Sequence, residues 1–145
     1  MILLDVNVLV YACRRDVPQH AEYKRWLSRV LVGGEPVGVA SETLASVVRI
    51  VTNRKVWHEP LRIVDALNFC EAVRAAPASV VVEAGAGHWE LFRAMCRDGD
   101  ARGNLVADAR LAAIALEQGS VLVTTDRDFA RFPRLRWRHP LVAVA

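Results

Sequence analysis

The stretch GNLVADARLAAIALEQG, residues 103–119, predicts an amphipathic helix that carries a carboxylate on its apolar side. The rest of the fold must provide partners for this carboxylate. Gly119 is placed to end the helix, and apolar residues recur at helical spacing, namely Leu105, Val106, Ala109, Ala112, Ala113 and Leu116. Asp108 falls within that apolar stripe. Burying an unpaired charge costs several kcal/mol, so the fold must supply Asp108 with hydrogen bonds, a cation or a metal ion.

Short apolar runs separated by helical patterns surround this stretch and predict the fold class. Strands are expected at residues 2–4, 37–40, 80–82, 121–124 and 135–137, and further helices at 6–13, 21–32, 42–51, 60–76 and 88–97. Ser41 is placed to cap the helix that starts at residue 42, and Pro60 to begin the next one. Strands that alternate with helices favour an α/β fold with a mainly parallel sheet of about five strands, covered on both faces.

Length and composition narrow the class of protein. The 145 residues indicate a single domain, residues 1–145, and the hydrophobic fraction of 53% is high enough that some of it is expected to serve an interface. Asp5 interrupts the only apolar run at the N-terminus, so we expect neither a signal peptide nor a membrane span. We therefore expect a cytoplasmic protein. The three cysteines are odd in number and far apart, which indicates buried thiols rather than a disulfide or zinc framework.

Acidic residues follow the predicted strands at the edge where an open α/β sheet forms its functional crevice. Asp5 follows the first strand, Glu42 the second, and Asp126 with Asp128 the fourth. Asp108 reaches the same edge because a helix that precedes a parallel strand begins at that strand's carboxyl end. We therefore expect Asp108 in the first turn of its helix, close to Asp5. Four separate segments offer carboxylates to one place.

Carboxylates that crowd together raise one another's pKa, and a divalent cation would remove this conflict. Oxygen ligands without accompanying His or Cys favour Mg²⁺ or Mn²⁺ over zinc. A water activated by such an ion can attack phosphorus. The net charge is only +3, but with these carboxylates gathered in one pocket the remaining surface is more basic, which suits a phosphodiester substrate.

Each acid also has a structural interpretation that the sequence leaves open. Glu42 at a helix start can merely complement the helix dipole, and Asp126 and Asp128 can cap the turn that follows them. Asp5 after an apolar strand and Asp108 on an apolar helix face favour function more strongly. Glu83 also follows a predicted strand, and the sequence pattern alone does not exclude it from the site.

Basic and aromatic residues offer candidate substrate contacts. In ARFPRLRWRHP, residues 130–140, Arg134, Arg136 and Arg138 alternate with apolar residues. In a strand this alternation would point three guanidinium groups to one side, either as a phosphate-binding stripe or to keep an edge strand soluble.

The four tryptophans could stack on RNA bases, but helical spacing places two of them in the core. Trp26 and Trp89 lie in predicted helical stripes, whereas Trp57 lies in a loop beside two basic residues and is the better interface candidate.

Two other classes of α/β protein fit poorly. A phosphoacceptor receiver domain or an aspartyl phosphotransferase would need a lysine near its late strands, but the only lysines, Lys24 and Lys55, come early. A dinucleotide-binding domain would need a glycine-rich turn after the first strand, where this chain has Asp5-Val6-Asn7.

Four blocks in order resemble PIN-domain ribonucleases, most closely the VapC-type toxins of bacterial toxin–antitoxin pairs. The blocks are LLDVNVLVYA (3–12), SETLASVVRI (41–50), GNLVADARLAAIA (103–115) and VTTDRDFARFPRLRW (123–137), and the similarity covers essentially the whole chain. The resemblance implies a three-layer α/β/α fold in which the third strand lies at the sheet edge, which would exclude Glu83.

The resemblance also implies roles for the acidic residues. Asp128 would be a more variable fifth member of a catalytic centre formed by Asp5, Glu42, Asp108 and Asp126, with Asp5, Asp108 and Asp126 as the metal ligands. Asn7 and Asn104 would orient ligands or water, and a turn or capping role is equally open for Asn104. Val6 stands where many PIN domains have a hydroxyl residue, so one supporting hydrogen bond of the family is not expected here.

The implied activity is endoribonuclease cleavage of RNA by water activated by Mg²⁺ or Mn²⁺. The implied partner is a small, VapB-like antitoxin that wraps the toxin and blocks its site, and such toxins tend to form homodimers. The alternative is a catalytically inactive or RNA-processing PIN-like module that binds RNA or a protein partner without consuming RNA.

Overall fold

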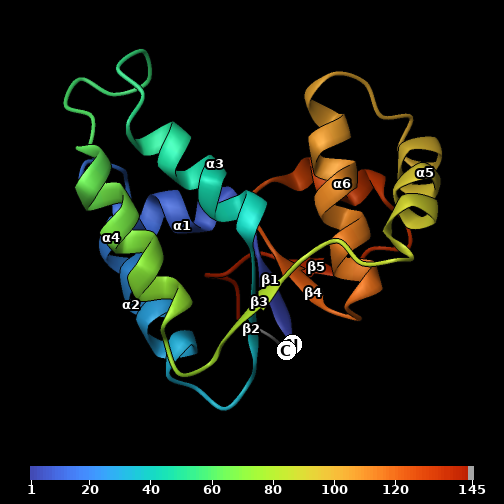
Figure 1. Ribbon diagram of the computed structural model, residues 1–145, viewed down its shortest axis with the longest axis horizontal. Coiled ribbons are helices and arrows are strands. Elements are labelled where there is room, and N and C mark those ends of the chain that lie inside the picture. The colour runs from blue at the N-terminus through green and yellow to red at the C-terminus, as the bar shows by residue number, and fades with distance from the viewer. Residues whose placement is uncertain (144–145) are drawn as a thin grey trace.

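A five-stranded sheet lies between two groups of helices in the computed structural model, which describes residues 1–143 (Figure 1). The strands are β1 (Ile2–Leu4), β2 (Val37–Ala40), β3 (Ser79–Val82), β4 (Val121–Val123) and β5 (Trp137–Arg138). They lie in the order β3-β2-β1-β4-β5, and every neighbouring pair is parallel. The predicted α/β class and the number of strands are confirmed.

The helices divide unequally between the two faces of the sheet. They are α1 (Val6–Cys13), α2 (His20–Leu31), α3 (Ser41–Val51), α4 (Ile63–Arg74), α5 (His88–Asp98) and α6 (Asn104–Glu117), with a 3-10 turn η1 (Arg127–Arg131) after β4. Figure 1 shows α1 to α4 on one side of the sheet and α5 with α6 on the other. Among residues 1–143, none of the helices has the length and apolar character of a membrane span.

Two apolar cores hold these layers together. Leu3 and Leu4 are neighbours in β1, yet Leu4 packs with Val8 in the core under α1 to α4, while Leu3 packs with Met95 in the core under α5 and α6. Successive side chains of a strand point to opposite faces, so a strand covered on both sides must be apolar at every position. This explains the unbroken apolar runs that marked the strands in the sequence.

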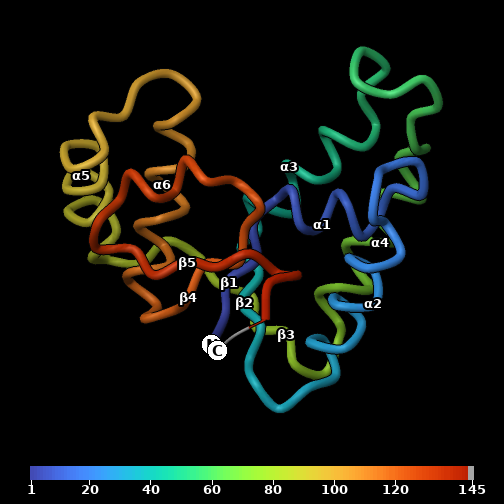
Figure 2. The backbone as a smooth tube through the Cα atoms, turned by 180° about the vertical axis from the view of Figure 1, so that it is seen from behind, coloured from blue at the N-terminus to red at the C-terminus, as the bar shows by residue number. Residues whose placement is uncertain are grey.

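The strand order makes the carboxyl end of β1 the centre of the functional edge. From β1 the chain builds outward through β2 to β3 on one side and through β4 to β5 on the other. Figure 2 shows the segment after β4 running toward α6 and returning as β5 on the outside of β4. The strand order changes direction between β1 and β4, and open α/β sheets bind ligands at such a point.

The helix after the residue 53–59 loop starts later than predicted. α4 begins at Ile63 rather than at Pro60. The N–H of Leu61 donates to the carbonyl of Val51 at 2.9 Å, and Arg62 is extended, so residues 60–62 follow the end of α3 instead of coiling. A tertiary hydrogen bond here outweighs the favourable position of proline at a helix start.

The last strand also starts later than predicted. β5 begins at Trp137 rather than at residue 135. The N–H of Leu135 donates to the carbonyl of Phe132 at 3.0 Å, which closes a turn, and the Leu135 side chain is buried in the core under α5 and α6. The alternating pattern of this segment therefore extends beyond the strand itself.

The helix that carries Asp108 begins where glycine permits a special backbone conformation. Gly103, its N-cap, has φ of 54° and ψ of −125°, a combination essentially reserved for glycine. Because α6 starts at Asn104 and a turn takes 3.6 residues, Asp108 lies at the start of the second turn, not in the first as expected. The first turn of α6 projects past the sheet (Figure 1), so Val106 is 36% exposed and not part of the buried stripe, whereas Ala112 is buried as predicted.

Candidate active site

Asp5 lies directly after β1, and three hydrogen bonds fix its carboxylate. Its Oδ1 accepts from the N–H of Val6 at 2.7 Å and so caps α1. Its Oδ2 accepts from the hydroxyl of Thr124 at 2.6 Å and from the side-chain amide of Asn7 at 3.1 Å. Burial raises the pKa of Asp5, the hydrogen bonds lower it and the charge of Asp126 raises it, with a net rise. Asp5 is therefore a rigidly oriented acid in a poorly solvated place.

Thr124 is a site residue that sequence reasoning missed. Its side chain is completely buried at the end of β4, and its Oγ1 accepts from the N–H of Asp126 at 3.0 Å while it donates to Asp5. This hydroxyl joins the end of β4 to the end of β1. The signal that could have found it is a hydroxyl residue that follows an apolar strand and stands two positions before an aspartate.

Asn7 supports the same junction from α1. Besides its contact with Asp5, its Nδ2 lies 3.3 Å from the hydroxyl of Thr124, and its Oδ1 accepts from the N–H of Thr125 at 3.2 Å. Asn7 thus orients an acidic side chain, as the family resemblance implied. Asn104 is the first residue of α6, and its side chain has no hydrogen-bond partner among residues 1–143.

Asp108 lies half-buried on α6, and its surroundings are acidic. Burial raises the pKa of Asp108 to about 6, and the charges of Asp126, Asp5 and Asp128 contribute to the rise. No side chain or backbone group between residues 1 and 143 donates a hydrogen bond to it. The structure therefore brings together the acids at the ends of β1 and β4 and on α6, which repel one another and find no cation within the described chain.

Asp126 begins the turn after β4, and its carboxylate has two possible uses. Its Oδ1 accepts from the N–H of Asp128 at 2.9 Å and caps η1, so the capping interpretation is correct for one oxygen. Its contribution to the pKa of Asp108 places the same carboxylate at the acidic centre. Asp128 is exposed and lines a hollow of about 390 Å³ together with Asp100, Arg102, Leu105 and Arg131.

Glu42 lies in the first turn of α3 and is paired with a basic residue. The Nε of Arg110 donates to its Oε2 at 2.6 Å, and the two side chains are 49% and 36% exposed, respectively. Glu42 is absent from the charges that raise the pKa of Asp108 or Asp5. The structure thus places Glu42 in a partly exposed position after β2, paired with an arginine that sequence reasoning missed.

Glu83 follows β3 at the edge of the sheet and stays apart from the acidic centre. β2 separates β3 from β1, as the resemblance implied. The hydroxyl of Ser41 donates to the Glu83 carboxylate instead of capping α3, whose N-cap is Ala40. The prediction that Ser41 caps the helix is therefore wrong, because Glu83 captures its hydroxyl.

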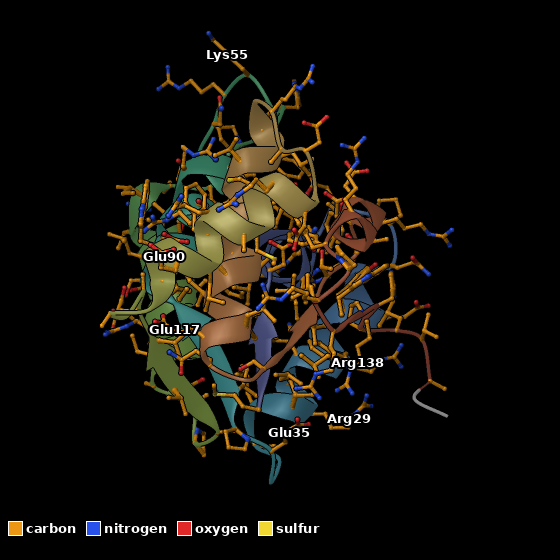
Figure 3. All side chains as sticks on the ribbon, turned by 90° about the vertical axis from the view of Figure 1, so that its right-hand side faces the viewer. Arg29, Glu35, Lys55, Glu90, Glu117 and Arg138 are labelled. Carbon is orange, nitrogen blue, oxygen red and sulfur yellow. The ribbon has the colours of Figure 1, made fainter. Side chains whose placement is uncertain are left out.

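Of the two interpretations left open for Arg134, Arg136 and Arg138, the structure does not support a continuous phosphate-binding stripe. The strand covers only two residues, and the guanidinium of Arg136 donates to the carbonyl of Gly119 at 3.1 Å, beyond the end of α6. Arg138 instead lines a hollow with Arg29 of α2, and the two are labelled near each other in Figure 3. These arginines point to different parts of the surface.

The tryptophans that the sequence assigned to the core and to an interface are only partly found there. Trp57 is fixed in the fold, because its Nε1 donates to the carbonyl of Ile50 at 2.8 Å and the guanidinium of Arg14 lies 4.2 Å from the centre of its ring. Trp26 is buried as predicted, whereas Trp89 is 63% exposed on α5 and was wrongly expected in the core.

The donors at the acidic centre are all oxygen atoms. Among residues 1–143, no three His, Cys, Asp or Glu side chains stand close enough to enclose an ion by themselves. Mg²⁺ usually keeps several waters and takes only one or two carboxylates directly, so Asp5, Asp108 and Asp126 suit an ion that completes its coordination with water. A cation there would relieve the repulsion that raises the pKa of Asp108.

Comparison with known proteins identifies the family and supports the fold. Residues 2–135 match the model of the PIN domain family. A VapC ribonuclease of Mycobacterium bovis is 49% identical over 97% of this chain and 96% of its own length, and ribonuclease VapC25 of Mycobacterium tuberculosis is 41% identical over 97% and 99%. Among solved structures, the complex VapBC2 of Rickettsia felis bound to a promoter DNA fragment has a chain that matches with a TM-score of 0.68, at 20% identity over 96% of this chain and 98% of that chain. The M. tuberculosis toxin VapC20, which cleaves the sarcin-ricin loop, matches with a TM-score of 0.66, at 19% identity over 90% and 93%.

Proposed function

Because the chain belongs to the PIN-domain family, we propose that it is a metal-dependent endoribonuclease and the toxin of a toxin–antitoxin pair. The observation that carries the proposal is the group of carboxylates from β1, α6 and the β4–η1 turn, in which burial first and the neighbouring acids second raise the pKa of Asp108 to about 6. A fold does not retain such repulsion for stability, and perturbed acids of this kind concentrate at functional sites.

Asp5, Asp108 and Asp126 are the residues that would hold Mg²⁺ or Mn²⁺. The bound ion would supply water activation and would offset negative charge on the phosphodiester. The protein's own contribution is orientation: Thr124 and Asn7 hold the carboxylate of Asp5 through hydrogen bonds of 2.6 and 3.1 Å. Water attacks phosphorus, the P–O3′ bond breaks, and the products carry a 5′-phosphate and a 3′-hydroxyl.

The protein partners follow from the same family membership. The solved structures of similar fold include VapBC assemblies from R. felis and from nontypeable Haemophilus influenzae, and a small VapB-like antitoxin is the partner we propose here. A homodimer is the proposed assembly of the toxin itself. Large apolar side chains on α4 and β3 offer surface for such contacts, namely Ile63, Val64, Leu67, Val80 and Val81. An enzyme that acts on cellular RNA works in the cytoplasm, where we place this chain.

Cleavage of RNA by the purified protein, free of any antitoxin, tests the proposal. We expect total RNA to be cut in Mn²⁺ or Mg²⁺, to stay intact in EDTA, and to stay intact with Asp108→Asn. Cleavage that persists in EDTA or in the variant would contradict the metal mechanism. Binding of RNA without cleavage under every condition would instead identify an inactive RNA-binding PIN module.

A further inference from the structure

One ion pair joins Glu42, a predicted catalytic carboxylate, to an arginine that the proposed reaction does not yet use. Arg110 on α6 and Glu42 on α3 meet across the edge of the sheet, with Nε donating to Oε2 at 2.6 Å. The pair therefore joins helices on opposite faces of the sheet. Among residues 1–143, this is the one ion pair that involves a predicted catalytic carboxylate.

The contact with Glu42 uses only part of the guanidinium. Arginine carries five N–H donors in a planar fork, and only the Nε donor is engaged by a partner among residues 1–143. The Nη groups are left with their four donors, and the side chain is 49% exposed. Arg110 therefore keeps unused donors on a half-exposed side chain two residues from Asp108.

The Nη donors of Arg110 can bind a negative group close to the acidic centre. RNA brings negative phosphates toward three carboxylates, those of Asp5, Asp108 and Asp126. Phosphate contacts from arginine supply much of the affinity of proteins for nucleic acids, and the guanidinium fork matches the geometry of phosphate oxygens. The positive guanidinium of Arg110 near these acids offsets the repulsion that they exert on the RNA backbone.

We propose that Arg110 serves two partners at once: its Nε fixes the orientation of Glu42, and its Nη groups bind a backbone phosphate of the RNA substrate. This assignment rests on the proposed ribonuclease function. It explains why the pair is formed by an arginine, because a lysine ammonium cannot present a fixed fork to two anions.

RNA binding without metal tests the phosphate contact separately from cleavage. The affinity of a fluorescein-labelled single-stranded RNA is measured by fluorescence anisotropy in EDTA over a range of KCl concentrations. Arg110→Gln is expected to weaken binding about fivefold and to reduce the salt slope by about 0.7, the value for one phosphate contact on single-stranded nucleic acid. Arg110→Lys should keep that slope because it keeps the charge.

A matched control removes the same charge elsewhere. Arg93 on α5 is also 49% exposed and pairs at 3.2 Å with Glu90 of the same helix, which is labelled in Figure 3. Arg93→Gln should leave the RNA affinity, the salt slope and the cleavage rate unchanged. Unfolding temperatures of all variants should match the wild type, because exposed ion pairs add little to stability.

Cleavage in Mn²⁺ tests the orientation of Glu42. Arg110→Gln should lower kcat/KM about tenfold or more, with both a higher KM and a lower kcat, whereas Arg110→Lys should recover KM but not kcat. If Arg110→Gln binds and cleaves RNA like Arg93→Gln while the wild type is active, the assignment of Arg110 is wrong and the ribonuclease proposal stands. If the wild-type protein neither binds nor cleaves RNA, both fail.

Discussion

Replacing Asp108 with asparagine should stabilise the metal-free protein while it abolishes RNA cleavage. The substitution keeps the size of the side chain and removes the charge that burial and three neighbouring acids disfavour. Because the pKa of Asp108 is raised from 3.8 to about 6, the native state binds more protons than the unfolded state between these values. Stability is therefore lost as the pH rises through that window, and the full penalty is present at neutral pH.

The size of the effect follows from the pKa of Asp108. One unit of pKa corresponds to about 1.4 kcal/mol, so a rise from 3.8 to about 6 would amount to about 3 kcal/mol for a fully buried group. Asp108 is only half-buried, and solvent screening reduces the expected gain for Asp108→Asn to about 1 kcal/mol at neutral pH. For a domain of this length that gain raises the unfolding temperature by about 3 °C.

Thermal unfolding in EDTA measures this gain directly. The variant should unfold at a higher temperature than the wild type near neutral pH, and the two should converge at about pH 4, where the wild-type carboxyl is protonated in the native state. Mn²⁺ should stabilise the wild type and leave the variant unchanged, because only the wild type retains the full set of acids. A variant that is less stable than the wild type at neutral pH would show that the Asp108 charge does not destabilise the native state, contrary to our expectation.

Three further predictions concern the surroundings of the acids. Thr124→Val should lower kcat in the RNA cleavage assay about tenfold and shift the pH profile upward, because Asp5 loses a hydrogen bond that lowers its pKa, and Thr124→Ser should restore both. Gly103→Ala should reduce the free energy of unfolding in urea by about 2 kcal/mol because of its φ of 54°, whereas Gly34→Ala, which meets no atom within 4 Å and has no unusual φ, should not. Glu83→Gln should leave the cleavage rate unchanged because β3 lies at the sheet edge, and a large loss of rate would contradict the exclusion of Glu83 from the active site.

The convergence of the acids could be predicted because it follows from topology alone. Asp5 and Asp126 follow parallel strands, and such strands end at one edge of the sheet wherever their exact boundaries fall. Asp108 could be placed at the same edge because its helix precedes β4 and runs antiparallel to it. Its place in the second turn depends on the start of α6 at Asn104, which the glycine before it sets through backbone conformation rather than through apolar spacing.

The partners of the supporting residues could not be predicted because these contacts join segments that are distant in the sequence. Thr124 donates to Asp5 across 119 positions, and Arg110 donates to Glu42 across 68. A local pattern carries no information about such partners until the strand order is known. The start of α4 is a similar case, since the hydrogen bond from Leu61 to the end of α3 overrides a favourable proline.

Anomalous diffraction from a crystal of the wild-type protein soaked in Mn²⁺ tests whether acids from separate segments form a single divalent-cation site. We expect one strong Mn²⁺ peak at the carboxyl end of β1, within direct coordination distance of at least one of Asp5, Asp108 and Asp126, with water completing the coordination. No peak there at a Mn²⁺ concentration that supports RNA cleavage, or a peak elsewhere alone, would contradict this expectation.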